Sequence, residues 1–160
     1  MKIIDNFLDK KKFDELENVF FGTEFPWYYN DSKSLKGDIN FQFIHAIVWD
    51  KTILSPHWKV VEPILKKLNY KEVIRVKANL TTKKNEIIKS PMHIDTGVKN
   101  SKTAVFYCNT NNGYTLFNSG EKVVSKANRA VVFEGNEFHC GVDCTDEKIR
   151  VVINFNYFEK

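Results

Sequence analysis

A closely spaced series of short β-type segments runs from Val73 to the end of the chain and constrains its fold more than any other feature. The segments are rich in Val, Ile, Thr, Phe and Tyr and are separated by turn residues such as the Asn-Gly pair at 112–113. We place these strands at 73–80, 87–95, 102–109, 114–118, 121–125, 129–134, 138–144 and 148–158. About eight strands at this spacing predict a β-sandwich, a barrel or a jelly roll.

Two helices are predicted before these strands. Apolar residues recur at roughly helical spacing over residues 5–21. A second helix over 55–68 begins with a Ser-Pro pair, which suits the N-cap and the first turn. The 160 residues therefore predict a single α+β domain, with a helical support region at 1–72 outside a β core at 73–158.

Composition and charge exclude several classes of protein. The net charge is +4, but the lysines are spread along the chain and form no basic stripe of the kind that binds nucleic acid. No apolar run has the length of a membrane span, and the N-terminus lacks a secretory h-region. Three cysteines without CxxC spacing fit a reducing compartment. We expect a cytoplasmic protein without nucleic-acid or membrane partners; the oligomeric state is not indicated.

Several predicted strands carry one polar face, because successive side chains of a strand alternate between faces. The strand at 148–158 has one wholly apolar face, and its other face is partly polar. The residues on the polar faces include Arg75, Lys77, Asn79, Tyr107, Arg150, Asn154 and Asn156. Each face alone could point to solvent. In a closed β fold the faces would instead converge on a pocket, where a metal and a bound anion would satisfy buried polar groups.

Three residues have the chemistry of a metal site. His93 and Asp95 are two residues apart and would point the same way on a strand, and His139 begins a later strand. Two histidines and one carboxylate form the facial triad of non-haem Fe(II) oxygenases, which leaves coordination positions open. Arg150 follows on the last strand and could bind a carboxylate through two hydrogen bonds. Taken singly, His93, Asp95 or His139 would more readily be explained as structural, whereas cosubstrate binding is favoured over a structural salt bridge for Arg150.

The chain resembles the 2-oxoglutarate- and Fe(II)-dependent oxygenases, especially the small prolyl-4-hydroxylase-like proteins of bacteria and tailed phages. The similarity covers roughly residues 73–158. It lies in HID at 93–95, TAVFYCN at 103–109, NGYTLF at 112–117, FHCG at 138–141 and RVVINFNYF at 150–158. It implies a double-stranded β-helix (jelly roll) core. It also implies hydroxylation of a C–H bond, in the first place of a prolyl residue in a peptide or protein, with a small molecule as another possible substrate.

The resemblance also implies roles for individual residues. Fe(II) would be bound by His93, Asp95 and His139. The far carboxylate of the cosubstrate 2-oxoglutarate would be bound by Arg150 and Tyr107, with Asn154 and Asn79 near it. O2 would be the second cosubstrate, succinate and CO2 the coproducts, and ascorbate would support turnover. Val152 and Asn154 depart from the hydroxyl residues that many relatives carry there. A phage-encoded protein of this kind would work in the host cytoplasm.

Other interpretations remain open at this point. A cupin-like module could bind a metal and a carboxylate without oxidising anything, and a plain interaction jelly roll could contain these residues by chance. Tyr107 could equally be a core tyrosine with a satisfied hydroxyl. Arg75 and Lys77 could meet an acidic substrate or line the rim. His45 and His57 lack companion ligands, so we expect structural roles for them.

Overall fold

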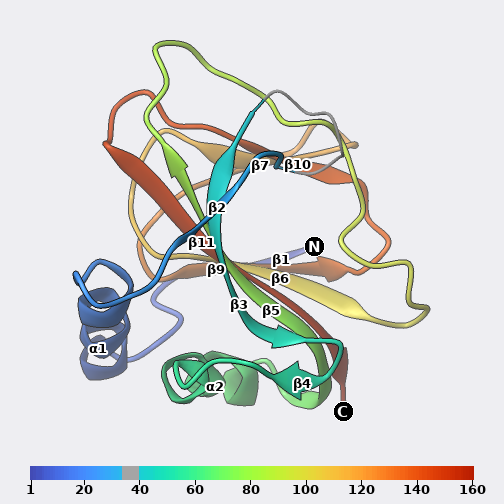
Figure 1. Ribbon diagram of the computed structural model, residues 1–160. Coiled ribbons are helices and arrows are strands. Elements are labelled where there is room, and N and C mark those ends of the chain that lie inside the picture. Colours follow the sequence, from blue (N-terminus) through green and yellow to red (C-terminus); the bar gives the residue numbers. More distant parts are fainter. Residues whose placement is uncertain (34–39) are drawn as a thin grey trace.

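A computed structural model describes residues 1–33 and 40–160. Within this part of the chain the strands form two antiparallel sheets, and two helices lie outside them, α1 (Lys10–Phe20) and α2 (Trp58–Lys67) (Figure 1). The larger sheet has the order β1 (Lys2–Ile4), β9 (Arg129–Glu134), β6 (Lys102–Tyr107), β11 (Ile149–Glu159), β5 (Tyr70–Thr82), β3 (Gln42–Trp49) and β2 (Tyr28–Asn30), with β4 (Thr52–Ile53) paired to β3. The smaller sheet has the order β10 (His139–Val142), β7 (Tyr114–Phe117) and β8 (Lys122–Val124).

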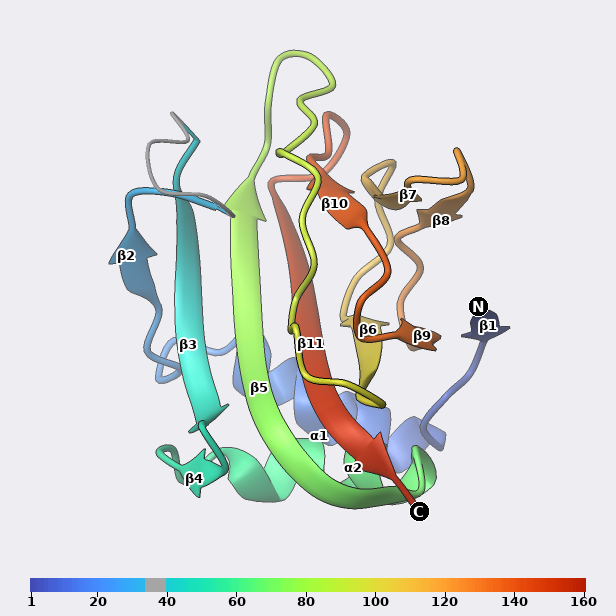
Figure 2. The ribbon, with the colours of Figure 1, turned by 90° about the vertical axis from the view of Figure 1, so that its right-hand side faces the viewer.

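The two sheets form the predicted jelly roll, with the helices packed outside it. In Figure 2 the segment that precedes β6 passes in front of β11, with β10 beside it and β7 and β8 further to the right, whereas α1 and α2 lie behind the larger sheet and cover its opposite face. Neither helix of the described residues is long and apolar enough to cross a bilayer.

The central strands β5 and β11 bury one face under the helices and turn the other toward the space between the sheets. Val76 on β5 and Ile153 and Phe155 on β11 are fully buried in the same core cluster as Leu16 and Ile64 of the helices. The alternate positions of both strands carry the predicted polar residues. Burial of the apolar face is therefore what directs the polar face into the interior of the jelly roll.

The prediction for the first helix is wrong at its start, since α1 begins at Lys10 and not at residue 5. Asn6 has a φ of 49°, which a helix cannot contain. Asp9 is the N-cap, and its side chain accepts a hydrogen bond from the Lys12 amide at 3.0 Å. The second helix likewise begins later than predicted, at Trp58, and Ser55 accepts a hydrogen bond from the His57 amide just before it.

Two further predictions, a helical region at 1–72 and a strand at 87–95, are corrected by the structure. The region 1–72 is not only helical, because β3 lies there and pairs with β5 inside the larger sheet. The strand predicted at 87–95 does not form; only isolated bridges join Lys89 to Val142 and His93 to His139. Pro91 lies between these bridges and has no N–H to donate, so a continuous ladder cannot pass through it.

Candidate metal centre

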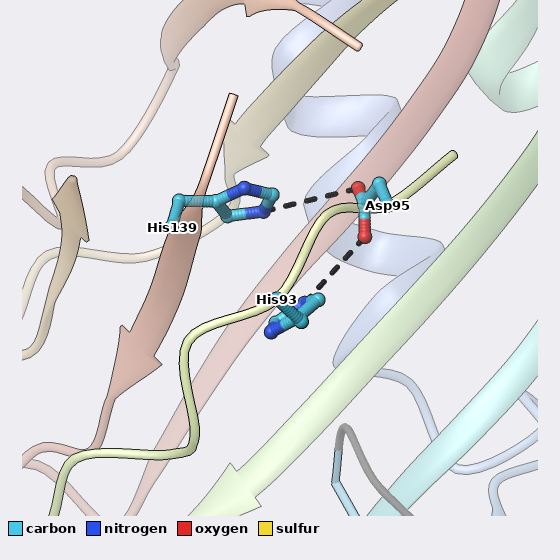
Figure 3. Close-up of side chains that lie close together, drawn as sticks. All are labelled: His93, Asp95 and His139. Carbon is cyan, nitrogen blue, oxygen red and sulfur yellow. Dashed lines mark ion pairs between the residues drawn. The ribbon is translucent and has the colours of Figure 1, made fainter. Parts of the chain in front are cut away.

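The three predicted metal ligands come together at one end of β10. The His93 amide donates to the His139 carbonyl at 2.9 Å, and the His139 amide donates back to the His93 carbonyl at 3.0 Å. Asp95 follows two residues later. One ligand atom from each of the three residues lies within 4.8 Å of the others. Both imidazoles point toward the Asp95 carboxylate, with Nε2 atoms 3.7 Å (His93) and 4.0 Å (His139) from its oxygens (Figure 3).

Backbone carbonyls fix which ring nitrogen of each histidine faces the centre. Nδ1 of His93 lies 3.1 Å from the Pro91 carbonyl, and Nδ1 of His139 lies 3.0 Å from the Glu137 carbonyl. A carbonyl can only accept, so Nδ1 carries the hydrogen in both rings. In the neutral imidazoles Nε2 then presents its lone pair to the centre, which is the arrangement that a metal ligand requires.

The Asp95 carboxylate is buried and is bound by three side chains from β5 and β11. Arg75 forms an ion pair with it at 3.0 Å, and the amides of Asn154 and Asn156 donate to it at 3.2 and 3.4 Å. Burial raises the pKa of this carboxyl, but the interactions with His93 and Arg75 outweigh burial and hold the pKa well below its usual range. Asp95 is therefore a carboxylate at any physiological pH.

The two histidines respond differently to their surroundings. Burial lowers the pKa of His139, which favours the neutral ring that binds metals. Burial also acts to lower the pKa of His93, but its contacts with Asp95 and with the Pro91 carbonyl outweigh burial and raise that pKa. A metal that binds here would therefore release a proton from those molecules in which His93 is protonated.

A polar cavity extends from these residues into the jelly roll. Lys77 and Asn154 line it near the three candidate ligands, and Val105 and Val152 supply apolar wall. The other polar residues of its lining include Lys33, Gln42, Asn79, Thr81, Ser90, Thr115, Asp143 and Arg150. Burial lowers the pKa of Lys77 to about 8, and the nearby charge of Arg75 acts in the same direction.

Arg150 is buried in the cavity wall with only part of its guanidinium occupied. Its Nε donates to the Ser125 hydroxyl at 2.9 Å, and its guanidinium carbon lies 5.8 Å from the centre of the Tyr107 ring. No carboxylate of the described residues forms an ion pair with it. A Cβ at Gly113 would come within 2.7 Å of the Arg150 side chain, so glycine there leaves the room that the arginine occupies.

Thr81 is a cavity residue that the sequence did not single out. It lies on β5 directly opposite Arg150 on β11. Its hydroxyl is buried and has no hydrogen-bond partner among the described residues. The predicted strand ended at residue 80, two residues before the end of β5; continued alternation from Lys77 and Asn79 would have placed Thr81 on the same face.

The remaining predicted site residues take different positions. Asn79 and Asn154 both line the cavity, with the Asn79 amide 3.5 Å from the Asn154 side-chain oxygen. Tyr107 is not among the lining residues: its ring faces Arg150 and its hydroxyl donates to Thr115 at 2.7 Å. Burial raises the pKa of Tyr107 to about 12. Its contact with a cosubstrate stays a prediction.

The other histidines and the cysteines lie outside the centre. His45 lies between the Pro26 carbonyl at 2.7 Å and the Ser55 hydroxyl at 2.8 Å, which gives it a structural role. Cys108, Cys140 and Cys144 are buried free thiols.

Comparison with known proteins finds similarity of structure only. No protein-family model and no curated protein sequence matches the chain. An oxidoreductase of the 2OG-Fe(II) oxygenase family from Burkholderia pseudomallei superimposes with a TM-score of 0.75 at 12% identity, over 98% of this chain and 84% of that one. A Pseudomonas putida prolyl-4-hydroxylase superimposes with a TM-score of 0.65 at 13% identity, over 99% of this chain and 92% of that chain.

A third similar structure is a prolyl hydroxylase from Trichoplax adhaerens, solved in complex with a peptide fragment of the oxygen degradation domain of hypoxia inducible factor. Its TM-score is 0.63 at 15% identity, over 99% of this chain and 83% of that chain. At such identities these similarities establish the jelly-roll fold that the three proteins share with this chain.

Replacement of a candidate ligand is expected to abolish tight binding of a divalent metal. Mn(II) affinity should fall more than about 100-fold in Asp95→Asn and in His139→Ala, since even partners outside the ligand set typically contribute about 10–100-fold. Binding can be measured by titration calorimetry. His57→Ala is the matched control, because His57 caps α2 without a side-chain hydrogen bond. Equal affinities in all four proteins would contradict the assignment.

Proposed function

We propose that this protein is an Fe(II)- and 2-oxoglutarate-dependent dioxygenase that hydroxylates a C–H bond. The observation that carries the proposal is a single cavity with a His-carboxylate-His centre at one end and a buried arginine at the other. Such an arginine, without a protein carboxylate among the described residues, suits a ligand that brings its own carboxylate.

The side chains that line the cavity fit both Fe(II) and 2-oxoglutarate. Two imidazole nitrogens and one carboxylate are a donor set that suits Fe(II) and leaves coordination positions open. Toward 2-oxoglutarate, Arg150 offers its terminal guanidinium nitrogens and Thr81 offers a buried hydroxyl without a partner. A bound carboxylate would satisfy that hydroxyl, which otherwise carries the cost of burial without a hydrogen bond.

The side chains would divide the work between binding, orientation and exclusion of water. Bound iron and 2-oxoglutarate would supply the oxidant from O2, with succinate and CO2 as coproducts. Arg150 and Thr81 would hold the far carboxylate and so fix the cosubstrate along the cavity. Arg75 and Asn154 would hold Asp95 in its ligating position. The apolar surface of Val105 and Val152 would limit the entry of water.

For the substrate we propose a prolyl residue of a peptide or protein. Two of the similar structures are prolyl hydroxylases, and the Trichoplax enzyme was solved with a peptide. These similarities support a peptide substrate through the shared fold alone, so a small molecule is the alternative that a substrate screen has to include.

Succinate formation from 2-oxoglutarate tests the proposed reaction. The purified protein is loaded anaerobically with Fe(II) and ascorbate, exposed to O2, and assayed for succinate with and without candidate substrates. We expect succinate from the wild type and none from Asp95→Ala. Binding of metal and 2-oxoglutarate without succinate under any substrate would instead favour the cupin-like binding module. Binding of neither would contradict the enzyme assignment.

The proposed role of Thr81 gives a separate prediction with two readouts. In Thr81→Val the affinity for 2-oxoglutarate should fall about tenfold or more, because a hydrogen bond to a charged group is typically worth about 1.5–3 kcal/mol. The free energy of unfolding of the ligand-free protein should not fall, since the hydroxyl has no partner to lose.

Thr82→Val is the matched control, because Thr82 is the next residue of β5 and points to the other face. It should leave 2-oxoglutarate affinity unchanged. An unchanged affinity in Thr81→Val as well would show that the Thr81 hydroxyl does not reach the cosubstrate.

A further inference from the structure

Lys77 lies in the cavity wall beside the candidate metal ligands. It is on β5, directly opposite Asn154 on β11, and both residues line the cavity. Asn154 in turn donates a hydrogen bond to the Asp95 carboxylate at 3.2 Å. Lys77 therefore belongs to the part of the cavity wall next to the candidate metal ligands.

The ammonium of Lys77 forms no hydrogen bond or ion pair with the residues that the structure describes. The neighbouring cations are engaged: Arg75 binds Asp95 at 3.0 Å and Asn156 at 2.8 Å, and Lys33 forms an ion pair with Asp143. A partly buried ammonium without an acceptor is costly, so an anion that enters the cavity would gain a strong, charge-assisted contact. With a pKa of about 8, Lys77 is mostly protonated at neutral pH.

The charges along the cavity also favour an additional anion. Among the described residues its lining carries cations at Lys33, Lys77 and Arg150 and carboxylates at Asp95 and Asp143. The two positive charges of a divalent metal and the two negative charges of a dicarboxylate cosubstrate cancel. The positive excess of the wall therefore persists when both are bound, and it is complementary to a negatively charged substrate.

Lys77 is poorly placed for the far carboxylate of the cosubstrate. That group would lie at Arg150 and Thr81, which face each other across β11 and β5. Lys77 precedes Thr81 by four positions on the same strand, or about 13 Å at ~3.3 Å per residue. Lys77 is instead opposite Asn154, beside the candidate metal ligands, where the substrate has to bring its reacting C–H bond.

We propose that the ammonium of Lys77 binds a carboxylate of the substrate, so that the enzyme selects substrates with an acidic group close to the carbon that is oxidised. This inference rests on the proposed function, because it assigns the second ligand of the same cavity. The carboxylate could be the substrate's own α-carboxylate or the side chain of a neighbouring acidic residue. Either carboxylate would present the same chemical group to Lys77, and matched probes distinguish the α-carboxylate from the acidic side chain.

The test measures binding, in protein loaded with Mn(II) and 2-oxoglutarate, of two probe pairs that differ in one carboxylate. The first pair is N-acetylproline and N-acetylprolinamide. The second is acetyl-Glu-Pro-amide and acetyl-Gln-Pro-amide. We expect at least one carboxylate probe to bind about tenfold or more tightly than its amide partner. Lys77→Met should reduce that preference to about twofold or less, and Lys77→Arg should retain part of it.

Controls separate this inference from the proposed function. Lys59→Met removes an exposed lysine of α2 and should leave every affinity unchanged. Absence of a carboxylate preference in the wild type, or an equal preference in Lys77→Met, would contradict the inference. So would a Lys77→Met protein that loses affinity for 2-oxoglutarate instead. Failure of the wild type to bind 2-oxoglutarate at all would count against the proposed function, whereas a Lys77-dependent carboxylate preference in the Mn(II) protein would still support the anion site.

Discussion

Two backbone hydrogen bonds between His93 and His139 are the constraint on which the candidate site depends. They hold the segment before Asp95 against β10, although Pro91 prevents a continuous ladder there. The bridge brings two imidazoles from distant parts of the sequence side by side, with ring centres 4.9 Å apart. It also sets Asp95 across from β5 and β11. A short, isolated bridge thus does what the predicted strand was expected to do.

The opposite wall completes the site through its contacts with Asp95. Arg75 on β5 and the asparagines at 154 and 156 on β11 all reach this carboxylate. Asn154, which replaces the hydroxyl residue expected from the resemblance, thereby connects the candidate ligand to the central strand. Arg150 lies four residues before Asn154 on the same strand and on the same face. One strand therefore positions residues at both ends of the cavity.

The sequence predicted those parts of the fold in which side chains alternate regularly. On β5 and β11 the apolar positions are buried under the helices, and the polar positions line the cavity or, like Arg75 and Asn156, bind Asp95. Strand β3 was missed because FQFIHAIVW is nearly continuous in apolar residues and shows neither the period of a strand nor that of a helix. Contacts such as Arg75 with Asp95 depend on tertiary packing and have no local signal in the sequence.

The central claim is that one cavity holds the metal and 2-oxoglutarate together, and their thermodynamic coupling tests it most directly. Binding of 2-oxoglutarate is measured by calorimetry with and without Mn(II). If 2-oxoglutarate binds to the metal, each ligand strengthens the binding of the other, and by linkage the factor is the same in both orders of addition. The account predicts stoichiometric binding that is at least about tenfold tighter with the metal present. Binding of 2-oxoglutarate with equal affinity in both conditions, or no binding in either, would contradict it.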